Sequence, residues 1–565
     1  MPRFGAAPLT AVLALALLGL SAPTATAAPA SEPLVYSTDD AALELEPIGS
    51  YETGVFDESA AEIVAYFGDR LFVVNALAGS VDVLDVSDPA APVKLFSLAN
   101  DGVANSVAVR ADGLGAIALE APTKTDNGTL AFFDAAADEA DAALGAVTVG
   151  ALPDMVTLSR DGRFAVVANE GEPNDDYTID PEGSVSIVTL PTTRTAPGQS
   201  AVRTAGFTEF EQGGSRVLDE RVRVFAGIAG DTNPVSRSLE PEYVTVIKST
   251  AYVVLQEANA VAEVNLPDAE VTDIRSFGFK DHGVAGAGLD PSDRDPRGAP
   301  EVDIRTFPGL FGMYMPDGIT AYTTRGRDYL VTANEGDARE WGDYEEGARA
   351  GDLEVCASSP LAAFTGDADL GRLNVTIENG FNAALGCYEE LYAFGARSFS
   401  IWTPDGDQVF DSGDALEEIT AAAQPAFFNS THSESNLEGR SDDKGPEPEN
   451  LAIGKVHGHT YAFIGLERVG GIVVYDITAP AESRFVTYVN NRDFSVSVED
   501  ADDQDAALAA AGDLGPEGLA FITAKESPTG QPMLAVGNEV SGTTTLFSIE
   551  AVSVGQQKIH KITFG

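Results

Sequence analysis

Acidic residues recur at two matched positions along this sequence. One set stands at the start of a short apolar segment, often after proline: Glu62, Asp154, Glu242, Asp317, Glu449 and Glu517. The other set follows a second apolar segment, often after asparagine: Glu120, Glu170, Glu257, Glu335, Glu467 and Glu539. Carboxylates gathered in one place raise one another's pKa unless a cation lies among them. Hard oxygen ligands without thiolates favour calcium or magnesium.

The recurrent acids predict a metal site. Its expected ligands are Glu62, Asp154, Glu170, Glu242, Glu257, Asp317, Glu335, Glu449, Glu467, Glu517 and Glu539. Calcium is the expected ion, because the protein is expected to work outside the cell. The competing interpretation is that these acids cap backbone amides and pair with arginines such as Arg339 and Arg468. Buried ion networks perturb carboxylates in this way without any function.

A mixed-charge segment, His432–Gly445, precedes the Pro448–Glu449 pair. It places histidine, arginine and lysine beside acids, a combination suited to binding a phosphate ester together with a metal. A solvated loop is the alternative. The predicted ligand-binding residues are Arg339, Asn436, Arg440, Asp442, Asp443 and Lys444. Two acidic stretches, 170–176 and 290–295, also resemble irregular cation-binding loops, with solvated turns as the alternative.

Familiar catalytic motifs are missing from the sequence. It has no Gly-x-Ser-x-Gly turn, no glycine-rich phosphate loop with lysine and no His-Glu-x-x-His. Five histidines leave few candidates for acid–base chemistry. We therefore predict no catalytic residue and favour a protein that is not an enzyme.

A repeated unit must position the recurrent acids. Pro153–Val156 leads to Val166–Glu170 and Ser184–Val188, and Pro516–Leu519 leads in the same way to Leu534–Glu539. Seven such recurrences predict an all-β fold, a seven-bladed β-propeller with one unit per blade. The first strand of each blade would line the central channel. The recurrent acids are therefore expected to meet at one channel mouth.

One segment outside the repeats is expected to close the ring. Leu43–Tyr51 resembles the outermost strand of a unit but precedes the first unit, so we assign it to the last blade, where it leaves no open sheet edge. Long loop insertions are expected at about 191–235, 275–310, 340–390, 405–445 and 490–512. The predicted organisation is an N-terminal linker at 28–42, a single propeller domain over 43–555 and a C-terminal tail at 556–565.

Residues 1–27 are predicted to be an export signal. Arg3 precedes the apolar run Leu9–Leu20, and Ala25–Ala27 offers the small-residue pattern of a cleavage site. The run is shorter than the roughly 20 residues that span a membrane. We expect a secreted, extracellular protein, which could associate with the cell surface and has no transmembrane segment in its mature chain.

Composition and charge exclude several classes of protein. The chain has 34 basic and 88 acidic residues, a net charge of −54 that would repel nucleic acid and anionic lipid. Its 28 Phe and 15 Tyr, with 44% hydrophobic residues, exclude a disordered chain. Two cysteines are too few for a disulfide-built scaffold. Export favours a disulfide between Cys356 and Cys387 over a catalytic thiol.

Three motifs carry a resemblance to a known family. Asn169–Pro173, Asn334–Glu340 and Arg440–Glu449 resemble the choice-of-anchor I family, and the resemblance covers about Leu43 to Ile549. It implies a secreted bacterial β-propeller, similar to mesenchyme-specific cell-surface glycoproteins, that works outside the cell or at its surface.

Two functions are compatible with these features. The favoured one is a calcium-binding β-propeller that acts as a non-enzymatic binding protein for an extracellular ligand or surface polymer, as a monomer. The alternative is a calcium-dependent extracellular phosphoesterase, like an alkaline phosphatase or phytase propeller. There, metals at the channel mouth would act with Arg440 and Lys444 on the phosphate.

Overall fold

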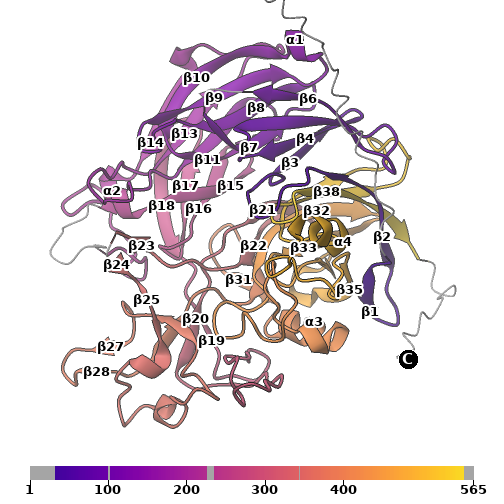
Figure 1. Cartoon of the computed structure of the whole chain (residues 1–565). Coiled ribbons are helices and arrows are strands. Elements are labelled where there is room, and N and C mark those ends of the chain that lie inside the picture. The colour runs from indigo at the N-terminus through magenta and orange to yellow at the C-terminus, as the bar shows by residue number, and fades with distance from the viewer. Residues whose placement is uncertain (1–31, 100–101, 226–234, 343, 553–565) are drawn as a thin grey trace, which may run out of the picture.

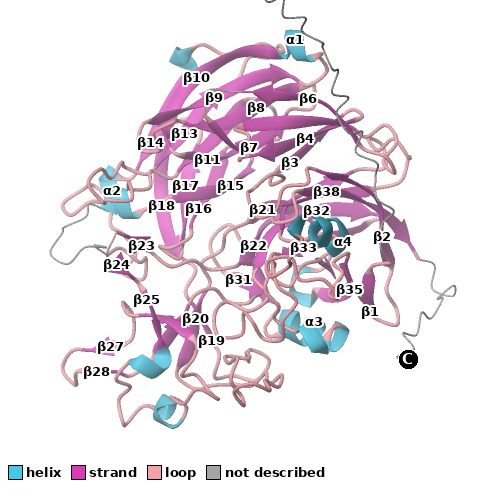
Figure 2. Ribbon diagram, viewed as in Figure 1, coloured by secondary structure: helices cyan, strands magenta, loops and turns pink. Residues whose placement is uncertain are grey.

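The computed structural model describes residues 32–99, 102–225, 235–342 and 344–552. The predicted export signal and C-terminal tail lie outside these ranges. Strands dominate the described chain, and the helices α1 (Glu139–Ala142), α2 (Val235–Ser238), α3 (Ala415–Ala423) and α4 (Gln504–Ala511) are short (Figure 2). The all-β prediction is confirmed.

The strands of each repeated unit form one antiparallel sheet. The first two sheets contain β3 (Val64–Phe67), β4 (Arg70–Asn75), β5 (Ser80–Asp85) and β6 (Val93–Ala99), then β7 (Val103–Val109), β8 (Leu114–Glu120), β9 (Asn127–Asp134) and β10 (Ala143–Ala151). The next two contain β11 (Pro153–Leu158), β12 (Phe164–Asn169), β13 (Ser184–Thr189) and β14 (Val202–Gly206), then β15 (Pro241–Ile247), β16 (Thr250–Leu255), β17 (Ala260–Asn265) and β18 (Glu270–Ser276).

The remaining repeats follow after a long insertion. One sheet contains β21 (Ile319–Thr324), β22 (Arg327–Asn334), β30 (Ser398–Trp402) and β31 (Gln408–Asp411). The next contains β32 (Pro448–Val456), β33 (His459–Leu466), β34 (Ile472–Asp476) and β35 (Arg484–Asn490). The last contains β36 (Pro516–Ile522), β37 (Met533–Asn538) and β38 (Thr543–Ala551).

Two N-terminal strands join the last two sheets. β2 (Leu43–Glu52) pairs antiparallel with β38, with Leu43 opposite Ala551 and Glu52 opposite Thr543. β1 (Leu34–Ser37) lies within the segment expected to be a linker and pairs with β35. The first two described strands are therefore added to sheets whose other strands come from the C-terminal part of the chain.

The first strand of each sheet contacts the first strand of the next. These contacts join β3 to β7, β7 to β11, β11 to β15, β15 to β21, β21 to β32, β32 to β36 and β36 to β3. The sheets are arranged around these inner strands (Figure 1). The fold is therefore propeller-like.

Alternate residues of the second strands build the core between sheets. In β4, Phe72 and Val74 pack with residues of β8 and β9, whereas Leu71 and Val73 pack with residues of β37 and β38. Successive side chains of a strand point to opposite faces, so one strand contributes to two interfaces. This explains the continuous apolar runs in the second strands, since each fully buried side chain contributes about 1.5–3 kcal/mol.

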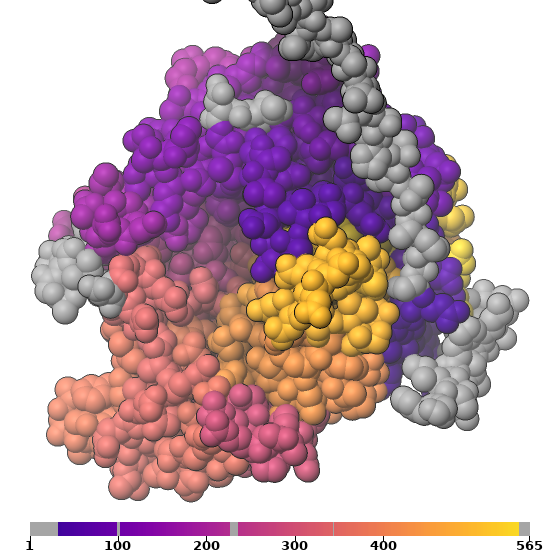
Figure 3. All heavy atoms as spheres, in the orientation of Figure 1, coloured from indigo at the N-terminus to yellow at the C-terminus, as the bar shows by residue number. Residues whose placement is uncertain are grey.

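The expected insertions at about 275–310 and 340–390 form a separate lobe, whereas those at about 191–235 and 405–445 contain β14 and β31 of the repeated sheets. The lobe contains a sheet made of β19 (Phe279–Asp281), β20 (Leu310–Met313), β25 (Gly347–Arg349), β26 (Asn374–Thr376) and β29 (Leu391–Ala393). The hairpins β23 (Glu340–Trp341) with β24 (Tyr344–Glu345) and β27 (Phe381–Asn382) with β28 (Cys387–Tyr388) also lie here. The lobe projects at the lower left of Figures 1 and 3. The predicted disulfide between Cys356 and Cys387 is present in it.

Candidate functional site

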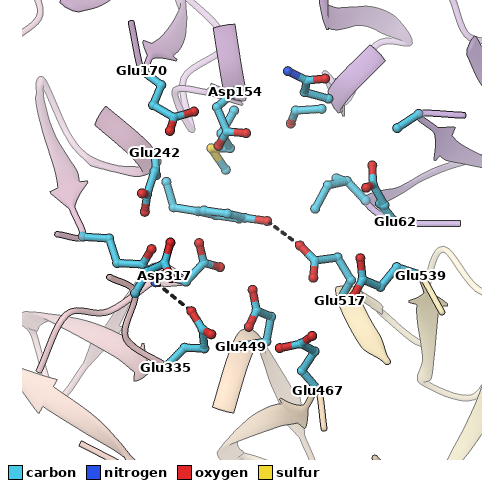
Figure 4. A pocket seen from close by; sticks show the side chains of 18 of the residues that line it. Glu62, Asp154, Glu170, Glu242, Asp317, Glu335, Glu449, Glu467, Glu517 and Glu539 are labelled. Carbon is cyan, nitrogen blue, oxygen red and sulfur yellow. Dashed lines mark hydrogen bonds between the residues drawn. The ribbon is translucent and has the colours of Figure 1, made fainter. Parts of the chain in front are cut away.

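Acidic side chains surround a cavity of about 510 Å³ at the inner strands. Ten of the eleven acids expected to bind metal line it: Glu62, Asp154, Glu170, Glu242, Asp317, Glu335, Glu449, Glu467, Glu517 and Glu539 (Figure 4). They come from sheets far apart in the sequence. The repeat therefore brings ten of the twelve recurrent acids to one cavity, whereas Glu120 and Glu257 do not line it.

A shift of pairing at the start of several inner strands aims these acids. Between Pro241 and Val244, the register of β15 on β16 slips, and the same irregularity follows Pro448 and Pro516. A β-bulge re-aims a side chain, and proline suits the first position of a strand because it has no N–H to pair. The acids next to these prolines, all lining the cavity, are Glu242, Glu449 and Glu517.

Asparagines fix the ends of the second strands. The side-chain amide of Asn169 donates to Ser186 Oγ at 3.0 Å, and that of Asn334 donates to Ser400 Oγ at 2.8 Å. Both asparagines are fully buried, and both bonds cross to the third strand of the same sheet. The glutamate that follows each asparagine is thereby held at the cavity wall.

Burial raises the pKa of most of the lining acids. It brings the pKa of Asp154 to about 6, that of Glu62 to about 7 and that of Glu539 to about 8, and neighbouring carboxylates add to each shift. For Glu242 and Asp317, burial and then nearby acids hold the pKa well above the ordinary value. The cavity therefore retains protons at neutral pH unless a cation replaces them.

Three oxygens in this cavity lack a neutral or basic donor. Glu242 Oε2, Asp317 Oδ2 and Glu449 Oε2 are buried and accept no hydrogen bond from a backbone, hydroxyl, amide or basic group of the described residues. The carboxyl groups of Asp317 and Glu449 contact each other. One carboxylate oxygen each from Glu335, Glu449 and Glu467 lie within 4.8 Å of one another, close enough to share an ion. Glu449 belongs to both groups, and its buried oxygen among other carboxylates fits a calcium ion, which takes six to eight oxygen ligands.

One side of the cavity carries basic residues. Lys444 Nζ pairs with Glu335 and lies 3.2 Å from Glu447 Oε2. Arg468 lies 3.1 Å from Glu447 and 3.0 Å from Glu467. Burial alone would raise the pKa of Glu447, but Lys444, Arg440 and Arg468 together hold it well below the ordinary value. In this part of the wall the acids form ion pairs with basic residues, as the competing interpretation predicts.

The predicted ligand residues near Lys444 in the sequence form ion pairs with other protein side chains. Arg440 Nη2 lies 2.7 Å from Glu447 and 2.9 Å from Asp443, and it does not line the cavity. Asp442 pairs with Arg372 and lies 3.2 Å from Arg349. Of the predicted ligand-binding residues, Lys444 alone is among the described residues that line the cavity.

Arg339 and Asn436 lie away from the cavity lining. Arg339 is 1% exposed, with its guanidinium 3.3 Å from Glu240 and stacked against Trp341. Asn436 donates to Glu434 Oε2 at 3.0 Å and accepts from the Thr431 amide at 3.1 Å, within its own loop. Both side chains support local structure in this arrangement.

Glu257 is buried outside the cavity lining. Its backbone oxygen accepts a hydrogen bond from Arg223 at 2.7 Å, and burial raises the pKa of its side chain to about 7. Sequence reasoning did not select Tyr243 or Asp337, which do line the cavity. Tyr243 follows the Pro241–Glu242 start, and its hydroxyl donates to Glu517 Oε1 at 3.4 Å (Figure 4).

Comparison with known proteins identifies the family. The profile of the choice-of-anchor I domain matches residues 62–480. The chain belongs to the choice-of-anchor I family. Gigasin-3a of Magallana gigas is 31% identical over 206 residues, which is 35% of this chain and 72% of that protein. The mesenchyme-specific cell surface glycoprotein of Strongylocentrotus purpuratus is 31% identical over 299 residues, 46% of this chain and 38% of the sea-urchin protein.

Solved structures similar to this choice-of-anchor I protein share little sequence with it. A streptogramin B lyase matches with a TM-score of 0.41 and 7% identity, over 90% of this chain and 98% of its own. A hydrazine synthase of Kuenenia stuttgartiensis matches with a TM-score of 0.41 and 12% identity, over 89% and 99%. Similarity this low carries no argument about activity. Within the described ranges, no helix has the length and hydrophobicity to cross a membrane.

Proposed function

We propose that this choice-of-anchor I protein is an extracellular or cell-surface, calcium-binding β-propeller that acts as a non-enzymatic binding protein. Seven blades, closed by β2 on β38, would hold the central cavity rigid. Family membership and the name of the sea-urchin relative support a place outside the cell. The observation that carries the proposal is the set of three buried oxygens of Glu242, Asp317 and Glu449 that no backbone, hydroxyl, amide or basic group of a described residue contacts by a hydrogen bond.

Calcium would resolve the electrostatic problem of this cavity. Buried carboxylates close together are unfavourable unless protonated or bound to a cation. A bound divalent ion removes that repulsion and leaves open coordination positions for an oxygen-rich ligand, such as an acidic surface polymer. The proposed chemistry is binding, since the basic residues of the described lining, Lys444 and Arg468, are paired with glutamates rather than open to a phosphate.

The test is calcium binding by the full chain and by the double variant Asp317→Asn, Glu449→Gln. We expect calorimetric titration and elemental analysis to show bound calcium in the wild type. A saturating ion stabilises the fold, by about 2.7 kcal/mol at a hundred times Kd. The double variant should lose calcium affinity by roughly tenfold or more at the cavity. Glu44→Gln, which removes an exposed acid from β2, is the matched control.

Failure of the wild type to bind calcium, or equal binding by the double variant, would contradict a calcium site in the cavity. The phosphoesterase alternative has one favourable observation, which is that Lys444 lines the same cavity as the acids. Its ammonium is already paired with Glu335 and Glu447, and this disfavours it as a phosphate ligand. Hydrolysis of p-nitrophenyl phosphate in calcium that is lost in Lys444→Met would establish the enzyme instead.

A further inference from the structure

A second carboxylate cluster lies outside the central cavity. Asp290 and Asp295 belong to the connection between β19 and β20, whereas Glu438 belongs to the connection between α3 and β32. One carboxylate oxygen from each of the three lies within 4.8 Å of the other two. None of them lines the central cavity. Two segments distant in the sequence therefore meet at three acids.

These acids are buried and lack a counter-charge. Asp290 and Glu438 are 0% exposed. Both side-chain oxygens of Glu438 and Oδ1 of Asp295 are buried and accept no hydrogen bond from a backbone, hydroxyl, amide or basic group of the described residues. The Glu438 carboxyl contacts those of Asp290 and Asp295 instead. Within the same ranges, none of the three forms an ion pair with Lys, Arg or His; nearby Arg294 and Arg305 pair with other acids. A buried charge without a partner is strongly unfavourable.

The buried Arg397 of this region forms its hydrogen bonds with other groups than the three side-chain carboxylates. Arg397 Nη1 donates to the backbone oxygen of Asp290 at 2.7 Å and to Glu417 Oε1 at 2.6 Å. Its Nη2 donates to the backbone oxygens of Ser441 and Asp443, at 2.8 Å each. The guanidinium thus supports the backbone around the cluster and leaves the three carboxylates uncompensated.

Backbone amides orient one of the acids. The N–H of Asp303 donates to Asp290 Oδ2 at 2.6 Å, and the N–H of Ser292 donates to Asp290 Oδ1 at 3.4 Å. The Asp290 carboxylate is therefore fixed, and it faces the side chains of Asp295 and Glu438. A preoriented ligand lowers the entropy that an ion must overcome on binding.

The oxygens of the cluster indicate which ion it would hold. Three carboxylates offer up to six oxygens and no thiolate or imidazole, which favours calcium over zinc or copper.

We propose that Asp290, Asp295 and Glu438 form a second calcium site, which fastens the inserted lobe to the segment that carries Lys444. The segment from Glu438 onward also contains Arg440, which pairs with Glu447. An ion held by Glu438 would fix this segment at one end, while the contacts of Lys444 fix it at the other. The second site is therefore structural, and it positions one wall of the central cavity.

Calcium stoichiometry of the full chain tests this site. We expect Glu438→Gln and Asp290→Asn each to bind one calcium ion fewer than the wild type, while Asp352→Asn, an exposed acid of the same lobe, binds the wild-type number. Amide hydrogen exchange locates the ion. Removal of calcium by a chelator should speed exchange in segments 282–309 and 429–445, which carry the three acids. The cavity variant Asp317→Asn, Glu449→Gln keeps Asp290, Asp295 and Glu438 and should still bind the second ion, so the two sites are counted separately.

A folding defect is distinguishable from loss of the ion. The amide of Glu438→Gln can donate to Asp290 or Asp295, so without calcium this variant should melt at or above the wild-type temperature. With calcium it should lack part of the wild-type rise in Tm. Wild-type stoichiometry in Glu438→Gln, or calcium-independent exchange in both segments, would overturn the second site.

Discussion

Glu447 and Glu449 stand two positions apart, yet the structure drives their protonation in opposite directions. Glu447 is surrounded by Lys444, Arg440 and Arg468, which lower its pKa despite full burial. Burial and then the other cavity acids raise the pKa of Glu449 well above its ordinary value. The charge of each residue is therefore set by the groups that surround it.

Raised carboxylate pKa values predict a loss of stability as the pH rises. Acids such as Asp154, Glu62 and Glu539 bind protons more tightly when folded than when unfolded, where their pKa is about 4. Their contribution to folding is complete below that value and is lost as the pH rises through about 6 to 8. In chelator, thermal melts should therefore give a lower Tm at pH 8 than at pH 6.

Calcium should reduce this difference, because it binds the deprotonated carboxylates and replaces their protons. The double variant Asp317→Asn, Glu449→Gln should show a smaller fall of Tm in chelator, since two acids can no longer ionise. A Tm in chelator that rises from pH 6 to pH 8 would contradict the protonation assigned to the cavity.

Neighbouring inner strands approach one another closely, and glycine makes one of these contacts possible. A Cβ on Gly518, in β36, would lie 2.7 Å from both the backbone oxygen of Glu62 and the Cα of Ile63. Backbone atoms cannot move aside as a flexible side chain can. Glycine at this position therefore lets the last sheet lie against the start of the first.

Gly518→Ala should destabilise the protein by about 1–3 kcal/mol, because the added methyl forces the two strands apart. Urea unfolding measures the change. Gly206→Ala, in β14, is the matched control, since its Cβ would meet nothing within 4 Å and its backbone is extended. Equal stability of the two variants would show that the approach of β36 to the first sheet is not tight.

The sequence predicts the strands and the positions of cavity acids where the pattern is local and repeated along the chain. Proline followed by an acid marks the inner strands with Glu242, Glu449 and Glu517, and these acids do line the cavity. The role of Glu447 was not predicted, because Arg468, one of its three cations, reaches it only through folding. The small sheet of the lobe was not predicted either, since strands of three or four residues carry no measurable periodicity.

At the scale of the whole molecule, β2 packs against two sheets at once. Leu43 and Leu45 are buried in a cluster that includes Phe547 and Ile549 of their own sheet and Val486 of the neighbouring one. An N-terminal strand thus shares a core with strands from the last part of the described chain. This arrangement supports a propeller whose first and last parts are joined.

Leu45→Ala should lower the free energy of unfolding by about 2–5 kcal/mol, since it leaves a cavity at this junction. Leu95→Ala, in β6, removes a leucine that is 45% exposed and should change it by less than about 0.5 kcal/mol. Chemical denaturation of both variants measures the difference. Matching values would mean that β2 adds little to the core.

The pairing of β1 with β35 and of β2 with β38 has a consequence for biosynthesis. Chains emerge from the ribosome N-terminus first, so β1 and β2 are made early and wait for partners that are made last. A chain cut short before β38 leaves the backbone edge of β2 and its two buried leucines exposed, a target for proteases and aggregation. The fold thereby acts as a check on completeness, because only a chain with both ends present can finish its last sheet.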